Sequence, residues 1–160
     1  MNEWQLEFGL DQVAKGIFYV LLFLLIISLI VTIIPSYKSE LKLHPTWKVG
    51  SIDDDGIFNK KDKSSLVSQL LYLGNGLKIE IDHDQSLTFQ IIFYDGNSNY
   101  LGISDEFSQN VVLTYSELQK RYLDVKAYRV VIKKIDKSGY INIFEKDIYS
   151  NYISIYEINH

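Results

Sequence analysis

The chain has 160 residues, with 16 basic and 20 acidic side chains and no cysteine. This length allows one ordinary domain with an appendage, and the missing cysteine excludes disulfides, a thiolate nucleophile and zinc sites of the zinc-finger kind. A net charge of -4 that is spread along the chain differs from the concentrated basic face that nucleic-acid binding requires, so we expect no nucleic-acid partner.

The first feature along the chain is a short amphipathic segment over residues 1–15. In it Trp4, Phe8 and Val13 lie among acidic and amide side chains. One interpretation is an interfacial helix at a bilayer surface, although such helices are usually basic and this one is acidic. The equal alternative is a segment that packs against a subunit of a membrane complex.

A long uncharged run follows, because no charged residue occurs between Lys15 and Lys38. About 20 apolar residues in a helix cross a hydrocarbon core of about 30 Å. The run therefore predicts a single transmembrane helix over 16–37, with the lipid bilayer as a partner. Trp4, Tyr19 and Tyr37 are the expected membrane-interface residues, since amphipathic rings prefer that depth.

The flanks of this run favour an uncleaved anchor over a signal peptide. The N-terminal flank is acidic, and Ile-Ile-Pro-Ser-Tyr follows the apolar residues where a cleavage site would carry small residues. Lys38, Lys42 and Lys48 lie close on the C-terminal side, and the positive-inside rule then favours a cytoplasmic C-terminal domain. We nevertheless expect a single-pass membrane protein with an extracytoplasmic domain, because a family resemblance of the C-terminal region implies that it faces outward.

After an expected connector over 38–45, the pattern changes to the alternation of β-strands. Apolar side chains recur at every second position, which predicts strands over 77–81, 87–94, 127–135 and 152–158. Asp95-Gly96 predicts a hairpin that returns over 99–103. Residues 116–122 are the one helical candidate. Many short strands at such spacing predict an antiparallel β-sandwich or barrel over 46–160.

Three motifs carry a resemblance to a known family. Trp47-x-x-Gly50 opens the domain, Phe93-Tyr94-Asp95 begins a hairpin that continues through Asn97 to Tyr100, and Tyr128-Arg129 lies in a later strand. In this order the region 46–158 resembles the carbohydrate-binding-like jelly-roll modules of Gram-positive phage tail proteins and bacterial surface proteins. The resemblance implies an all-β, jelly-roll-like antiparallel β-sandwich behind the helix. It also implies an outward-facing domain that binds a glycan or surface polymer.

Aromatic residues are the candidates for ligand binding. The chain has 12 tyrosines and two tryptophans, and sugar sites use exposed aromatic faces beside polar groups. Trp47, Tyr72, Tyr94 and Tyr100 are the expected ligand-binding residues, with core packing as the alternative for each. The C-terminal tyrosines are candidates for a protein-binding face, because tyrosine is enriched at interface hot spots: Tyr140, Tyr149, Tyr152 and Tyr156.

Acidic clusters are the candidates for metal binding. Asp53-Asp54-Asp55-Gly56 is not an EF-hand loop, because Ser64 stands where its twelfth residue would be a glutamate. An irregular calcium site that joins Asp53, Asp55 and Asp62 is one interpretation, and a solvated acidic loop is the other. Similarly, Asp82-His83-Asp84 is read either as a metal site or as a turn whose carboxylates bind local amides.

Catalytic patterns are missing from the sequence. The three histidines, His44, His83 and His160, belong to no zinc-binding helix motif, and neither a nucleophile elbow nor a phosphate-binding glycine loop occurs. We therefore predict a membrane-anchored, non-catalytic module that recognises a cell-envelope glycan or surface polymer. The alternative is a structural accessory subunit of a membrane or virion complex, with the β-sandwich as a protein–protein interaction module.

Overall fold

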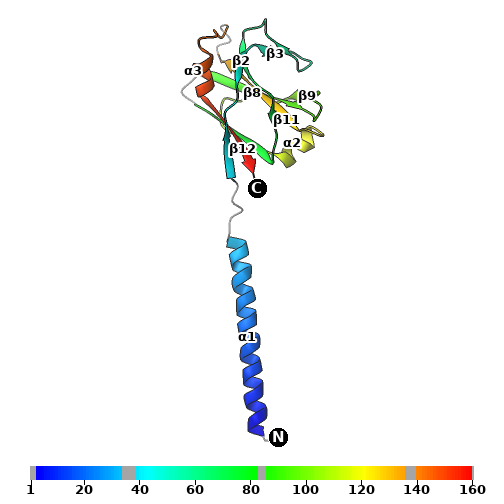
Figure 1. Ribbon diagram of the computed structural model, residues 1–160, viewed down its shortest axis with the longest axis vertical. Coiled ribbons are helices and arrows are strands. Elements are labelled where there is room, and N and C mark those ends of the chain that lie inside the picture. Colours follow the sequence, from blue (N-terminus) through cyan, green and yellow to red (C-terminus); the bar gives the residue numbers. More distant parts are fainter. Residues whose placement is uncertain (1–2, 34–38, 83–85, 136–139, 160) are drawn as a thin grey trace. The chain divides into compact units, whose positions relative to one another are not determined.

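The computed structural model describes residues 3–33, 39–82, 86–135 and 140–159, with the side chains of the first helix described over residues 12–29. The chain divides into two compact units, Met1–Tyr37 and Lys38–His160. The first unit contains helix α1 and the second, which we call the β-domain, contains the strands (Figure 1).

Helix α1 (Glu3–Ile33) is one uninterrupted helix of 31 residues. Its segment Gln12–Leu29 is long and apolar enough to cross a membrane. Residues 3–15 contain no proline and continue as one helix into the apolar run, with no break at residue 15. Trp4 and Tyr19 both belong to this helix, Tyr19 with an exposed ring, whereas Tyr37 lies outside the described residues.

The described residues of the β-domain form short antiparallel strands and two short helices. The helices are α2 (Tyr115–Arg121) and α3 (Lys146–Asn151). The strands are β1 (Ser39–Leu43), β2 (Trp47–Val49), β3 (Ser51–Ile52), β4 (Phe58–Asn59), β5 (Ser65–Ser68), β6 (Leu71–Tyr72), β7 (Gly76–Ile81), β8 (Leu87–Tyr94), β9 (Tyr100–Ile103), β10 (Val111–Thr114), β11 (Ala127–Lys134) and β12 (Ile153–Asn159). The predicted strands in β7, β8, β9, β11 and β12 are confirmed to within about one residue at each end.

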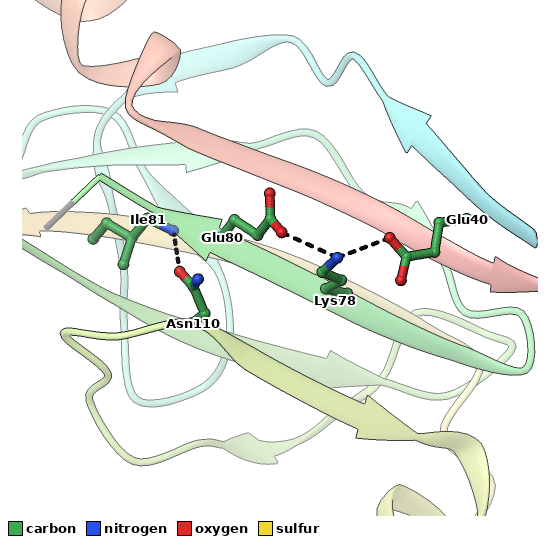
Figure 2. Close-up of polar contacts among 5 residues, drawn as sticks. All are labelled: Glu40, Lys78, Glu80, Ile81 and Asn110. Carbon is green, nitrogen blue, oxygen red and sulfur yellow. Dashed lines mark hydrogen bonds and ion pairs between the residues drawn. The ribbon is translucent and has the colours of Figure 1, made fainter. Parts of the chain in front are cut away.

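The first sheet has the strand order β1-β12-β7-β10, and every pairing in it is antiparallel. Strand β12, near the C-terminus, lies between β1 and β7 and so connects the first strand of the domain to the rest of this sheet. The Asn110 side chain accepts a hydrogen bond of 2.9 Å from the Ile81 amide, which extends the pairing of β10 with β7 beyond Val111 (Figure 2).

The second sheet has the strand order β2-β5-β11-β8-β9, with β6 also pairing with β11. Strand β11 pairs with β8 along eight residues of each strand, from Ala127 opposite Tyr94 to Lys134 opposite Leu87. Strands β3 and β4 form a separate two-stranded hairpin. This hairpin lies between β2 and β5 in sequence, and its side chains cover part of the second sheet, as described below.

A single large apolar cluster fills the space between the two sheets. It takes Leu77, Ile79 and Ile155 from the first sheet and Phe89, Ile91 and Ile132 from the second, each at most 1% exposed. These side chains alternate along their strands with residues that point outward, as the sequence pattern predicts. The two sheets therefore pack face to face, in a sandwich-like arrangement.

The expected connector over 38–45 is the main error of the sequence-based account. Residues 39–43 form β1, which pairs with β12 from Ser39 opposite Asn159 to Leu43 opposite Ile155. The strand was not predicted because it is a largely exposed edge strand with few apolar side chains. Edge strands of this kind carry charged residues, which protect them against pairing with other chains.

Candidate functional site

The outer face of the first sheet is occupied by contacts within the chain. The Lys78 ammonium lies 2.8 Å from the Glu40 carboxylate and 3.0 Å from that of Glu80 (Figure 2). The hydrogen bond to Glu40, followed by that to Glu80, raises the pKa of Lys78, and the bond from Lys78 lowers the pKa of Glu80. The same ammonium lies 5.1 Å from the centre of the Tyr156 ring. These polar groups bind one another, so this face is a poor candidate for ligand binding.

The outer face of the second sheet differs, because part of it is covered by the β3–β4 hairpin. A second apolar cluster forms there from Val67, Ile92, Tyr94, Ala127 and Val131, with Ile52 and Phe58 of the hairpin packed against it. Burial of these residues holds the hairpin on the sheet. The hairpin then forms one wall above the part of the sheet that remains uncovered.

Tyr94 and Gly56 position the turn of this hairpin. The Tyr94 hydroxyl donates a buried hydrogen bond of 2.9 Å to the Gly56 carbonyl. Gly56 has a φ of +77°, and an added Cβ atom would lie 2.5 Å from the ring of Tyr100. The Asp53 carboxylate accepts hydrogen bonds from the amides of Asp55 (3.2 Å) and Ile57 (2.7 Å), which close the turn. Only glycine combines this conformation with this lack of space.

A pocket of about 320 Å³ lies between the hairpin and the uncovered part of the sheet. Its apolar surface comes from Ile92, Ile103 and Val131 on the sheet and from Ile52 on the hairpin. Polar side chains supply the rest of the lining: Ser51, Asp53, Asp54, Asn59, Asp62, Ser64, Ser65, Gln90 and Lys133. This lining is more polar than that of most small-molecule sites, so it suits a ligand that carries several polar groups.

Two of the polar groups in the pocket are held in place by hydrogen bonds. The Lys133 ammonium donates to the Gln90 side-chain oxygen at 2.6 Å. The Asp62 carboxylate accepts from the Ser64 amide at 2.8 Å, and this bond lowers the pKa of Asp62. The pocket therefore offers a fixed ammonium group and fixed carboxylate and amide groups to hydroxyl-bearing ligands.

The four aromatic residues expected to bind ligand do not come together. Tyr94 is 4% exposed, so it is not available for stacking on a sugar ring, and Tyr100 packs beside it with a ring separation of 6.4 Å. Trp47 packs partly buried against the main core and borders a separate small pocket beside His44. Tyr72 is 77% exposed on β6. None of the four lines the polar pocket. Their expected role in ligand binding stays a prediction that is separate from this pocket.

The three aspartates expected to bind calcium are only partly brought together. Asp53 and Asp62 line the polar pocket, whereas Asp55 does not. Asp53 already accepts two backbone hydrogen bonds in the hairpin turn. Over the part of the chain that the structure describes, no three or more histidine or acidic residues are grouped as a metal site. Of the Asp82-His83-Asp84 motif, His83 and Asp84 lie outside the described residues.

The C-terminal tyrosines belong to different parts of the β-domain. Tyr149 and Tyr152 pack against the main core with a ring separation of 6.5 Å, and Tyr156 belongs to the outer face of the first sheet. Tyr140 is exposed in the segment before α3. The expected protein-binding face formed by these tyrosines stays a prediction.

Gln90 and Lys133 are two of the several pocket residues that the sequence did not single out as candidates. A weak signal for them exists, since each is a polar residue that faces outward within a strand whose neighbours are buried. No family model, curated protein or solved structure was found to match the chain. The polar pocket is accordingly defined by its own geometry: an apolar base, a polar lining and a hairpin wall held by Gly56 and Tyr94.

Proposed function

We propose that the protein is a single-pass, membrane-anchored binding module that recognises a cell-envelope glycan or surface polymer without catalysis. The observation that carries this proposal is the polar pocket on the outer face of the second sheet. Its volume of about 320 Å³ suits a small group such as a sugar unit, and its polar lining provides both donors and acceptors for hydroxyl groups.

The order of the strands supports a jelly-roll assignment for the β-domain. Without β2, β3, β4 and β6, eight strands remain. When these eight are numbered 1 to 8 in chain order, the first sheet has the order 1-8-3-6 and the second has the order 2-7-4-5. A jelly roll has eight strands in two sheets, arranged as two Greek keys, and has this order. Because a sandwich fold hosts many functions, the pocket rather than the fold is the argument for ligand binding.

Helix α1 supports the membrane anchor. Its segment Gln12–Leu29 has the length and composition of a transmembrane helix, and the described side chains of this segment are exposed in the isolated chain. Apolar side chains with no protein surface to cover them are stabilised by a bilayer. An envelope ligand requires an extracytoplasmic β-domain. Protease treatment of intact cells should therefore degrade the β-domain, and its full protection would contradict this function.

Binding by the isolated β-domain tests the proposal directly. Both apolar clusters form without any described residue of α1, so a fragment of residues 38–160 retains its own core. This fragment should be retained by purified cell-wall glycans. Lys133→Ala, which removes a fixed donor of the pocket, should weaken retention about tenfold, as expected for loss of a hydrogen bond from a charged group. The matched control is Lys120→Ala, an exposed lysine on α2 away from the pocket.

An accessory-subunit function is the second candidate, and the length of α1 favours it. The helix has 31 residues, which span about 46 Å, against about 30 Å of hydrocarbon core. Its first turns, with Glu3, Glu7 and Asp11, therefore extend beyond the apolar segment and offer a surface to other subunits. Under this alternative, the full chain co-purifies with partners at fixed stoichiometry through residues 1–37, and the isolated β-domain binds no glycan.

A further inference from the structure

A second surface of the β-domain combines protruding apolar side chains with lysines. We call it the apolar–basic patch, and it lies around a hollow of about 910 Å³ next to β2. Its apolar members are far more exposed than side chains of their kind usually are: Tyr140 is 75%, Ile143 67% and Phe144 84% exposed. Its basic members are Lys60, Lys61 and Lys63, all exposed.

Hydrogen bonds fix this patch in shape. The Ile141 amide donates to the Lys63 carbonyl at 2.7 Å, which joins the two segments of the patch. The Asn142 side chain accepts from the Phe144 amide at 3.2 Å, and the Glu145 carboxylate accepts from the Asn142 amide at 2.8 Å. Ile141 is fully buried beneath this turn. The buried Ile141 side chain therefore anchors the turn, and the side chains of Ile143 and Phe144 extend into solvent.

The three lysines leave positive charge on the patch. Among the described residues, none of the three has a carboxylate within ion-pair distance. Two acidic side chains of the same two segments are engaged elsewhere: Asp62 accepts from Ser64, and Glu145 accepts from Asn142 and lies 3.7 Å from Lys134. The chain as a whole carries a net charge of -4, so this group of three lysines is opposite in sign to the overall charge.

These features together fit an anionic lipid surface. Bulky side chains at the tip of a turn bury themselves at the boundary of headgroups and acyl chains, and nearby lysines are attracted to anionic headgroups. Exposed apolar residues of this kind on a soluble domain mark an interaction site. We propose that the apolar–basic patch binds anionic phospholipid, with Phe144 and Ile143 inserted and Lys60, Lys61 and Lys63 at the headgroups.

The location of the patch makes it a separate site. It adjoins α3, which precedes the start of β12, whereas Ser39, where the chain enters the domain, pairs with Asn159 at the end of β12 (Figure 1). The patch thus lies at the end of the domain opposite to the chain entry. Of the residues that line the polar pocket, none belongs to the patch, so lipid binding leaves glycan binding possible on the same domain.

Flotation of residues 38–160 with lipid vesicles tests this proposal. Vesicles of phosphatidylcholine in which a third of the lipid is phosphatidylglycerol should carry the domain upward, and vesicles of phosphatidylcholine alone should bind it at least tenfold more weakly. Each lysine near an anionic surface contributes about fivefold in affinity, so Lys60→Glu with Lys61→Glu should abolish flotation. Binding to the anionic vesicles should weaken as salt is added, because salt screens the headgroup charge.

The apolar part is tested by Phe144→Ser, which should reduce binding about tenfold or more. The matched controls are Tyr72→Ser, a similarly exposed aromatic elsewhere, and Lys120→Glu, an exposed lysine on α2, both of which should bind as the unchanged domain does. Thermal melting checks that each variant is folded. Equal binding to both kinds of vesicle, no binding to either, or equal effects of Phe144→Ser and Tyr72→Ser would overturn the proposal. A domain that ignores vesicles yet binds glycan would overturn this proposal alone.

Discussion

Replacement of Gly56 by alanine tests how the hairpin wall of the polar pocket is held. At φ +77°, a residue with a Cβ atom costs about 1–2 kcal/mol. The new Cβ atom would also lie 2.5 Å from the Tyr100 ring, and overpacking of this kind costs about 1–3 kcal/mol. We therefore expect Gly56→Ala to lower the free energy of unfolding by about 2–4 kcal/mol, which includes partial relief by movement of Tyr100.

The matched control is Gly96→Ala, in the turn after β8. An added Cβ atom there meets nothing closer than 3.7 Å, at the Lys126 side chain, and the backbone is not in the left-handed region. The change should stay within about 0.5 kcal/mol of the unchanged domain.

The assay is urea unfolding of residues 38–160, followed by far-ultraviolet circular dichroism, with thermal melting as a second measurement. For a domain of this size, a loss of 2–4 kcal/mol lowers the Tm by roughly 8–20 °C. Ile52 and Phe58 of the hairpin pack against the second apolar cluster, so displacement of the hairpin exposes part of that cluster and lowers global stability. If Gly56→Ala and Gly96→Ala unfold at the same urea concentration, the account of the hairpin is wrong.

Three further predictions follow from other contacts. Tyr94→Phe leaves the Gly56 carbonyl without its buried donor and should cost about 1–2 kcal/mol of unfolding free energy, whereas Tyr72→Phe on the surface should cost nothing measurable in the same urea assay. The folded state lowers the pKa of Asp62, so the ionised carboxylate stabilises the fold above its unfolded pKa, and this stabilisation is lost as the pH falls through its folded pKa. Asp62→Asn should therefore lose less stability on acidification than the unchanged domain, as measured by urea midpoints between about pH 5 and pH 2. Phe23→Arg places a charge inside the apolar segment of α1, which costs about 2.5–3.5 kcal/mol of membrane-insertion free energy. Membrane fractionation should then show part of the full chain in the soluble fraction. Val13→Arg, near the end of the segment, should cause a smaller shift.

The strands with a buried face were predictable because each shows its burial in its own residues. Strand β8 is one example, since Leu87, Phe89, Ile91 and Phe93 alternate toward the main core. Helix α2 was also predictable from its own residues, because Thr114 and Glu117 form a capping box at its start. The Thr114 hydroxyl accepts from the Glu117 amide, and the Glu117 carboxylate accepts from the Thr114 amide. Such signals involve residues within a few positions of one another.

The features that were missed depend on residues far apart in sequence. Strand β1 is visible only through its pairing with β12, more than a hundred residues later, because its own side chains are largely exposed. The polar pocket joins Ser51, Gln90 and Lys133 from three separate segments, and local periodicity assigns each a face but not a neighbour. For the same reason the aromatic candidates were grouped by residue type, whereas the fold buries Tyr94 and exposes Tyr72.

The most direct test of the proposed glycan recognition is a nuclear magnetic resonance titration of residues 38–160 with soluble fragments of purified envelope glycan. The account predicts saturable shifts at the amides of Ser51, Asn59 and Gln90, which line the polar pocket, and unchanged signals at Lys78 and Glu80, whose side chains already bind each other on the opposite sheet. Shifts that gather on Lys78 and Glu80, or no shifts with any fragment, would contradict it.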